Sequence, residues 1–136
     1  MIILSYKNVF INSHLIIKMQ HKITFLALSN ILKAVEGGST FGSIELESQI
    51  VLKFIAANEQ AGIELCVTDI TNNNSIPGAA ATKLKRVHRL RDEGWLEFST
   101  STQHHRRLRI VLSQKSKDEM SQMSEVLNLQ LRSILS

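Results

Sequence analysis

Hydrophobic residues recur along this chain with two different periods, which divide it into a series of short elements. Apolar positions at helical spacing predict helices over residues 23–36, 43–61 and 116–135. Two other runs, 95–99 and 108–112, alternate apolar and polar side chains, as the half-buried strands of a β-hairpin do. The pattern therefore predicts two helices, then a hairpin, then a long last helix.

The segment between the second helix and the hairpin carries the most informative pattern. It predicts a short extended piece at 63–65, a brief helix at 67–73, and a longer helix from Pro77 or Gly78 to Glu93. Proline suits a first helical turn, and Ser75 is placed to accept hydrogen bonds from free amides there. The side expected to face the core consists of Ala80, Leu84, Val87 and either Leu90 or the stem of Arg91. This order of elements is typical of a winged helix-turn-helix with one additional helix at each end, a mostly helical α+β fold.

The bulk properties suit one cytoplasmic domain. The 136 residues allow a single core, which we assign to residues 19–136, with 1–18 as an N-terminal extension of unassigned structure and Met19 as an alternative start. A single cysteine is compatible with a reducing compartment. No apolar run approaches the ~18 residues that span a bilayer, and no basic segment leads into an apolar one, so we expect neither a membrane partner nor a signal peptide.

Positive charge is concentrated in one quarter of the chain. Residues 75–109 hold eight of the 16 Lys and Arg residues but three of the 12 acidic ones, which gives this stretch +5 and the remainder −1. Such an uneven distribution is typical of a face that binds phosphates, although a solvated basic surface without a partner has the same signature. Aromatic residues make up 5% of the chain, which argues against a stacking surface for single strands.

A basic helix with a small-residue start fits the major groove of double-stranded DNA, where such proteins place the second helix of the motif. Residues 78–82 read Gly-Ala-Ala-Ala-Thr, which lets the backbone approach the bases. We expect base-edge contacts from Ala79, Thr82, Lys83 and Arg86. Lys85 and Arg89 are assigned to phosphates.

The hairpin tip, His104 to Arg107, is the predicted wing. An arginine there can enter the minor groove, where the negative potential is enhanced, and Arg109 lies near the backbone. The complete set of predicted DNA contacts is Ser75, Gly78, Ala79, Thr82, Lys83, Lys85, Arg86, Arg89, His105, Arg106, Arg107 and Arg109.

Two stretches resemble the MarR-type transcriptional regulators: Val67-Thr68-Asp69-Ile70 with the basic helix ending Leu90-Arg91-Asp92-Glu93-Gly94-Trp95-Leu96, and the wing ending Arg106-Arg107-Leu108-Arg109-Ile110-Val111-Leu112-Ser113. The resemblance covers residues 44–127. It implies a winged helix with a three-stranded sheet, transcriptional regulation, and a homodimer formed through the terminal helices. At the wing tip His105 stands where the family usually has Asp.

The sequence gives weaker indications of a redox, metal or catalytic site. Cys66 stands where relatives often have a capping Thr, and a thiol at a helix start is a possible redox site, although a lone cysteine is most often a small buried hydrophobe. Histidines 88, 104 and 105 match no structural zinc spacing. No phosphate loop, zinc-binding helix or nucleophile elbow occurs, so we expect neither an enzyme nor a cofactor.

Two other functions stay open at this point. A winged helix can act as a protein–protein interaction module whose basic face meets an acidic partner without intrinsic DNA binding. A regulator of this kind can also respond to an unknown small-molecule effector or to oxidant, with a pocket between the domain and the terminal helices. The apolar stripe of the last helix favours a homodimer over simple packing within one chain.

Overall fold

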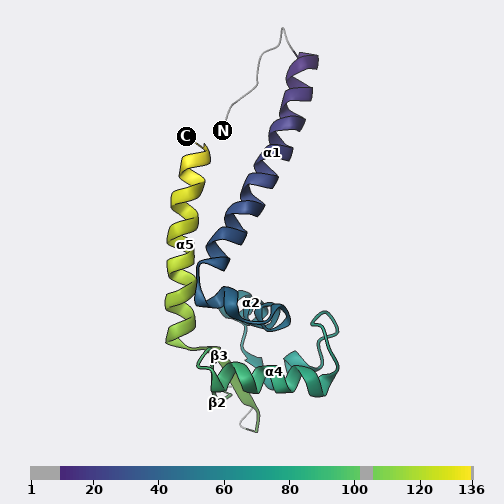
Figure 1. Cartoon of the computed structure of the whole chain (residues 1–136). Coiled ribbons are helices and arrows are strands. Elements are labelled where there is room, and N and C mark those ends of the chain that lie inside the picture. The colour runs from purple at the N-terminus through teal and green to yellow at the C-terminus, as the bar shows by residue number, and fades with distance from the viewer. Residues whose placement is uncertain (1–9, 102–105, 136) are drawn as a thin grey trace.

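The computed structural model describes residues 10–101 and 106–135 (Figure 1). The elements follow the predicted order, with a small three-stranded sheet in a mostly helical chain. They are α1 (Phe10–Gly37), the 3-10 turn η2 (Thr40–Ser43), α2 (Leu46–Gln60), β1 (Leu65–Cys66), α3 (Val67–Thr71), α4 (Ala80–Asp92), β2 (Leu96–Thr100), β3 (Leu108–Leu112) and α5 (Gln114–Leu135). The predicted winged helix-turn-helix architecture is confirmed.

The core lies where α2, α3 and α4 meet the sheet. Burial follows the helical period in α2, where Val51, Leu52 and Ile55 are removed from solvent. Phe41 of η2 packs edge-on against Trp95, with ring centroids 6.4 Å apart at 78°. The aromatic pair thus joins the turn before α2 to the turn that follows α4.

The sheet has the strand order β1-β3-β2, and both pairings are antiparallel. In the hairpin, Leu96 pairs with Leu112 and Thr100 with Leu108, so Ile110 and Leu112 of the central strand reach the same buried face. The predicted bounds of β3 are confirmed residue for residue. The short β1 adds a third strand, which anchors the start of α3 to the hairpin.

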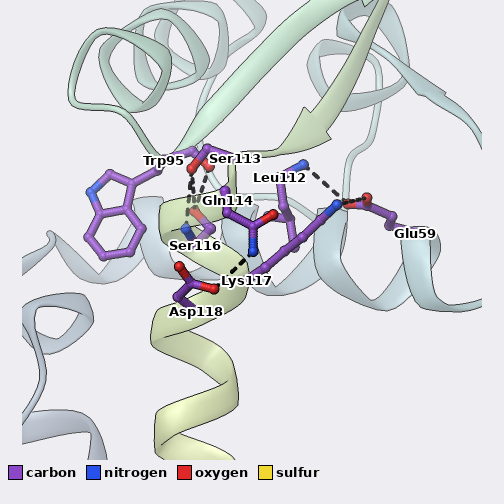
Figure 2. Close-up of polar contacts among 8 residues, drawn as sticks. All are labelled: Glu59, Trp95, Leu112, Ser113, Gln114, Ser116, Lys117 and Asp118. Atoms are coloured by element: carbon purple, nitrogen blue, oxygen red, sulfur yellow. Dashed lines mark hydrogen bonds and ion pairs between the residues drawn. The ribbon is translucent and has the colours of Figure 1, made fainter.

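A group of hydrogen bonds joins the end of the hairpin to the start of α5 (Figure 2). The Ser116 hydroxyl donates to the carbonyl of Trp95 at 2.5 Å, and the Leu112 amide donates to Glu59 at 3.1 Å. Lys117 forms an ion pair with the same Glu59 at 3.4 Å. Glu59 belongs to α2, so the first turn of α5 is tied to both the sheet and the second helix.

The helices α1 and α5 pack together near η2 and extend away from the winged helix (Figure 1). The helix α1 begins at Phe10, well before the predicted residue 23, and passes through position 19 without a break. Glycines 37 and 38 end it near the predicted place. In the described residues, no helix is long and apolar enough to cross a membrane.

The second helix begins three residues later than predicted. Ser43 was expected to cap it, but residues 40–43 form the separate turn η2, whose amide at Gly42 donates to the Ser39 hydroxyl at 3.3 Å. Phe41 lies within this turn, and its ring is buried against Trp95.

Candidate nucleic-acid interface

The helix-turn-helix consists of α3, the turn at residues 72–79, and α4. Helix α4 begins at Ala80, later than the Pro77 or Gly78 start predicted from the sequence. Gly78 has φ +107°, a conformation that no helix contains, so the helix cannot begin before it. Ser75 therefore does not cap α4; Ala79 occupies the N-cap position without a side-chain hydrogen bond.

The unobstructed start of α4 is the feature most relevant to a nucleic acid. Residues 77–82 are exposed and mostly small, and the first amides of the helix have no capping side chain. Free amides and a small surface allow close approach to a negatively charged backbone. Of the predicted contacts, Gly78, Ala79 and Thr82 lie on this exposed segment, and Ser75, which is also exposed, lies two residues before it.

The buried side of α4 differs from the prediction. Lys83, Val87 and Leu90 face the core, whereas Ala80 is exposed and Leu84 remains 37% exposed. The helix is thus rotated so that a lysine takes a position that an apolar residue was expected to fill.

Lys83 has 3% of its surface exposed, which contradicts the expectation that it belongs to the outer cationic surface. Its ammonium donates to the carbonyl of Asn73 at 2.6 Å and to that of Thr71 at 3.4 Å. Burial of the charge is tolerated because two carbonyl oxygens at the end of α3 replace water. The side chain therefore holds the turn that precedes its own helix.

Arg86, which was expected to contact base edges, also makes hydrogen bonds within the protein. Its side chain is 16% exposed, and its Nε donates to Glu45 at 2.9 Å. One terminal nitrogen donates to the carbonyl of Pro77, also at 2.9 Å. The guanidinium thus lies between the start of α2 and the turn before α4, rather than free at the outer surface.

The remaining cations of α4 point to solvent. Lys85 is exposed, and the side chain of Arg89 is 62% exposed, with Glu45 as a distant partner at 3.8 Å. Together with Thr82, these residues occupy one side of the helix, opposite Val87 and Leu90. They form the outward face of α4.

The wing supplies further positive charge next to α4. Arg106 and Arg107 are exposed, while Arg109 on β3 is half-buried and its Nε has no hydrogen-bond partner in the described part of the chain. His105 lies outside the described residues.

Aromatic contacts fix the hairpin against α4. The guanidinium of Arg91 lies 4.8 Å from the centre of the Phe98 ring, and His88 meets the same ring edge-on at 5.7 Å. Since Phe98 belongs to β2, these contacts set the position of the wing relative to the outward face of α4.

Cys66 is buried and occupies the N-cap of α3, where its amide donates to Asp69 at 2.8 Å. Its redox role stays a prediction. Within residues 10–101 and 106–135, no group of three or more His, Cys, Asp or Glu side chains is placed to hold a metal ion.

An apolar cavity of about 320 Å³ lies between α1, α2 and α5. It occupies the position expected from the sequence for a pocket between the domain and its terminal helices. The cavity is lined largely by Leu32, Val35, Phe41, Met120, Met123 and Leu127.

Comparison with known proteins gives a consistent result for the fold. No protein-family model matches the sequence, and no curated protein matches it. Similar solved structures include YusO from Bacillus subtilis, with 11% identity, a TM-score of 0.60, and coverage of 96% of this chain and 84% of that one. The transcriptional regulator Tm0710 from Thermotoga maritima is 16% identical with a TM-score of 0.60, covering 89% and 78%.

A third similar structure is a single-residue mutant of MepR from S. aureus bound to an oligodeoxyribonucleotide. It is 15% identical, with a TM-score of 0.58 and coverage of 91% of this chain and 81% of that one. The chain thus has the winged helix-turn-helix fold of the MarR-type transcriptional regulators, as the sequence motifs predicted.

Proposed function

We propose that this protein is a transcriptional regulator that binds double-stranded DNA with sequence preference. The observation that carries the proposal is the combination of an exposed, uncapped start of α4 with cations on its outward face and on the wing. Helix α4 and the hairpin lie at the same end of the molecule, away from the free ends of α1 and α5 (Figure 1). A solved protein of this fold is bound to an oligodeoxyribonucleotide, which supports DNA as the partner in general.

The outward face of α4 fits the major groove. Ala79 and Thr82 are positioned near base edges, with Ser75 and Gly78 allowing the backbone to approach. Lys85 and Arg89 provide charge for phosphates, which supply most of the affinity and its salt dependence. Lys83 and Arg86 contribute differently, since their charged groups are already bound within the protein.

The wing extends the contact beyond the major groove. Arg106 and Arg107 are exposed at the base of the hairpin tip, where they fit the neighbouring backbone or the minor groove. The half-buried Arg109 is placed to support them from β3. We include His105 in this contact on the sequence alone.

The terminal helices are proposed to form a homodimer. Phe25 on α1 is 69% exposed and Leu129 on α5 is 64% exposed, and Leu26 and Val126 are also open to solvent. Two long helices with exposed apolar side chains, extending from a small domain, are stable when a second copy covers them. A two-fold dimer would present two copies of α4 to half-sites about one helical turn apart.

The cavity between α1, α2 and α5 is the place where a small apolar effector would act. The cavity is lined by the proposed dimer helices α1 and α5 and by α2 of the winged helix. A bound effector would therefore alter the position of the dimer helices relative to the winged helix.

The test is selection from a library of random duplexes about 30 base pairs long, enough for two half-sites. Retained and unselected pools are then titrated by fluorescence anisotropy at two salt concentrations. The proposal expects binding that weakens steeply with salt, and tighter binding of the retained pool. A folded protein that binds neither pool at low salt would instead have a docking face for an acidic protein partner.

A further inference from the structure

We propose that Arg86 and Glu45 position the turn at residues 72–79 for DNA, and that Arg86 does not itself read bases. The inference rests on the proposed function and deepens it, because it assigns sequence preference to the geometry of this turn. Three observations carry it: the contacts of Arg86, the shape of Gly78, and the parallel role of Lys83.

The Arg86 guanidinium connects three elements. From α4 it donates to the Glu45 carboxylate at the N-cap of α2, and to the Pro77 carbonyl in the turn. Planar arginine is suited to such a double contact because its donors are fixed in one plane. Since the side chain is 16% exposed and two of its nitrogens already donate within the protein, most of the guanidinium is withdrawn from a base.

Gly78 shows that the turn is shaped around this guanidinium. A Cβ atom at position 78 would lie 2.7 Å from a terminal nitrogen of Arg86. The positive φ of Gly78 turns the chain so that the Pro77 carbonyl faces the arginine while the start of α4 remains open. Gly78 and Arg86 are thus compatible with the same turn conformation, in which the Pro77 carbonyl accepts a hydrogen bond from Arg86.

Lys83 holds the other end of the same turn. Its ammonium binds the carbonyls of Thr71 and Asn73, and the Asn73 carbonyl also accepts the amide of Ile76. Two cations of α4 therefore bind carbonyls near both ends of the turn at residues 72–79. These contacts fix the turn from which the exposed Ala79 and Thr82 follow.

Glu45 is the distinctive member of the arrangement. A carboxylate beside a DNA-binding helix repels phosphate, so its presence needs a compensating role. The Glu45 carboxylate accepts a hydrogen bond from Arg86 and lies 3.8 Å from the Arg89 guanidinium. These two contacts hold both arginine side chains beside the start of α2. Removing the charge of Glu45 therefore has opposite effects under the two interpretations of Arg86. If Arg86 positions the turn, preference for the selected DNA falls; if Arg86 contacts DNA directly, binding becomes tighter.

The experiment uses Glu45→Gln, Arg86→Gln and the double variant in the full chain. Hydrogen exchange of the peptide covering residues 72–82 is measured without DNA. Binding to the selected and unselected duplex pools is then measured across salt concentrations. Lys85→Gln is the control for an exposed cation of α4, and Glu97→Gln is the control for loss of a nearby negative charge.

The proposal expects faster exchange in the turn for both single variants, and no further change when Glu45→Gln is added to Arg86→Gln, because Glu45 acts on the turn through Arg86. Preference for the selected pool should fall about tenfold, comparable to the loss of a good base contact. The slope of log K against log salt should stay at the wild-type value for Arg86→Gln. Lys85→Gln should instead make the slope less negative by about 0.9 and leave hydrogen exchange in the turn unchanged.

A direct DNA contact by Arg86 gives different results and would overturn the proposal. In that case hydrogen exchange in the turn is unchanged, and Arg86→Gln makes the slope of log K against log salt less negative. Glu45→Gln then tightens DNA binding more than Glu97→Gln does. If the wild-type protein binds no DNA, the proposed function fails, and the exchange data alone still decide whether Glu45 and Arg86 hold the turn.

Discussion

The Glu119 carboxylate accepts hydrogen bonds from both the backbone amide and the hydroxyl of Thr40, each at 2.8 Å. The same oxygen accepts the Phe41 amide at 3.3 Å. Glu119 belongs to α5 and Thr40 begins η2, so one carboxylate joins the long last helix to the turn between α1 and α2. This contact lies between the proposed dimer helices and the winged helix.

The contact predicts acid sensitivity of this junction. The Thr40 hydroxyl, the amides of Phe41 and Thr40, and the charge of Lys115 lower the pKa of Glu119 from its ordinary value of 4.5, against the opposing effect of burial. Because the folded-state pKa is lowered, the stabilisation is complete above the unfolded value and is lost as pH falls through the folded one. Glu119→Gln should therefore reduce stability at neutral pH and weaken its dependence on acid.

Circular dichroism during acid titration and urea unfolding at neutral pH provide the measurement. We expect a loss of about 1 kcal/mol at neutral pH for Glu119→Gln, because charged acceptors form stronger bonds than neutral ones. Glu125→Gln, on the exposed side of α5, is the matched control and should unfold like the wild type. Identical acid unfolding of all three proteins would show that the Glu119 contact does not contribute.

Gly78 should be less tolerant of alanine than Gly62, although both have positive φ. A Cβ at Gly62 meets nothing within 4 Å, so Gly62→Ala costs only the backbone strain, about 1 kcal/mol. Gly78→Ala adds a close approach to Arg86 and should also reduce preference for selected DNA. Thermal unfolding and DNA titration of both variants measure the difference; equal effects on both assays would refute the role of Gly78.

Lys83 should behave as a structural residue. Lys83→Met keeps the aliphatic volume but removes the ammonium that donates to the Thr71 and Asn73 carbonyls, so we expect a loss of about 1–3 kcal/mol in unfolding free energy. Lys85→Met, at an exposed neighbouring position, should stay within about 0.5 kcal/mol of the wild type. Urea denaturation of the two variants is the measurement, and equal stability would argue against the buried contact.

The dimer proposal predicts a strong effect of charge on α5. Leu129→Glu places a carboxylate on an apolar face that two-fold symmetry presents twice, so the variant should sediment as a monomer. Ile63→Glu is the control, since Ile63 is also an exposed hydrophobic residue but lies outside α1 and α5. Analytical ultracentrifugation should show dimers for the wild type and the control. A monomeric wild-type protein would contradict the proposal.

Periodicity predicted the elements well where side chains alternate simply. The bounds of β3 are as predicted, and α5 begins two residues earlier than expected. The start of α4 was placed too early, because Pro77 is favourable in a first helical turn, but the sequence does not reveal the positive φ of Gly78. Local preference was overridden by the geometry of the turn.

The side chains of the candidate site were harder to predict than its location. The charge pattern pointed to α4 and the hairpin, yet it treated every cation as an outward one. Lys83 is buried because carbonyls distant along the chain accept its protons, and Arg86 is held by a carboxylate 41 residues away. Neither partner is visible in the periodicity of the helix.

Salt dependence of DNA binding tests the central claim most directly. The affinity of the wild type, Lys85→Gln and Arg106→Gln for the selected duplex pool is measured over a series of salt concentrations. We expect a steep negative slope of log K against log salt for the wild type, and a slope about 0.9 less negative in each variant as one phosphate contact is lost. A folded wild-type protein that binds no duplex at low salt, or slopes that are the same in all three proteins, would contradict the assignment of this face to DNA.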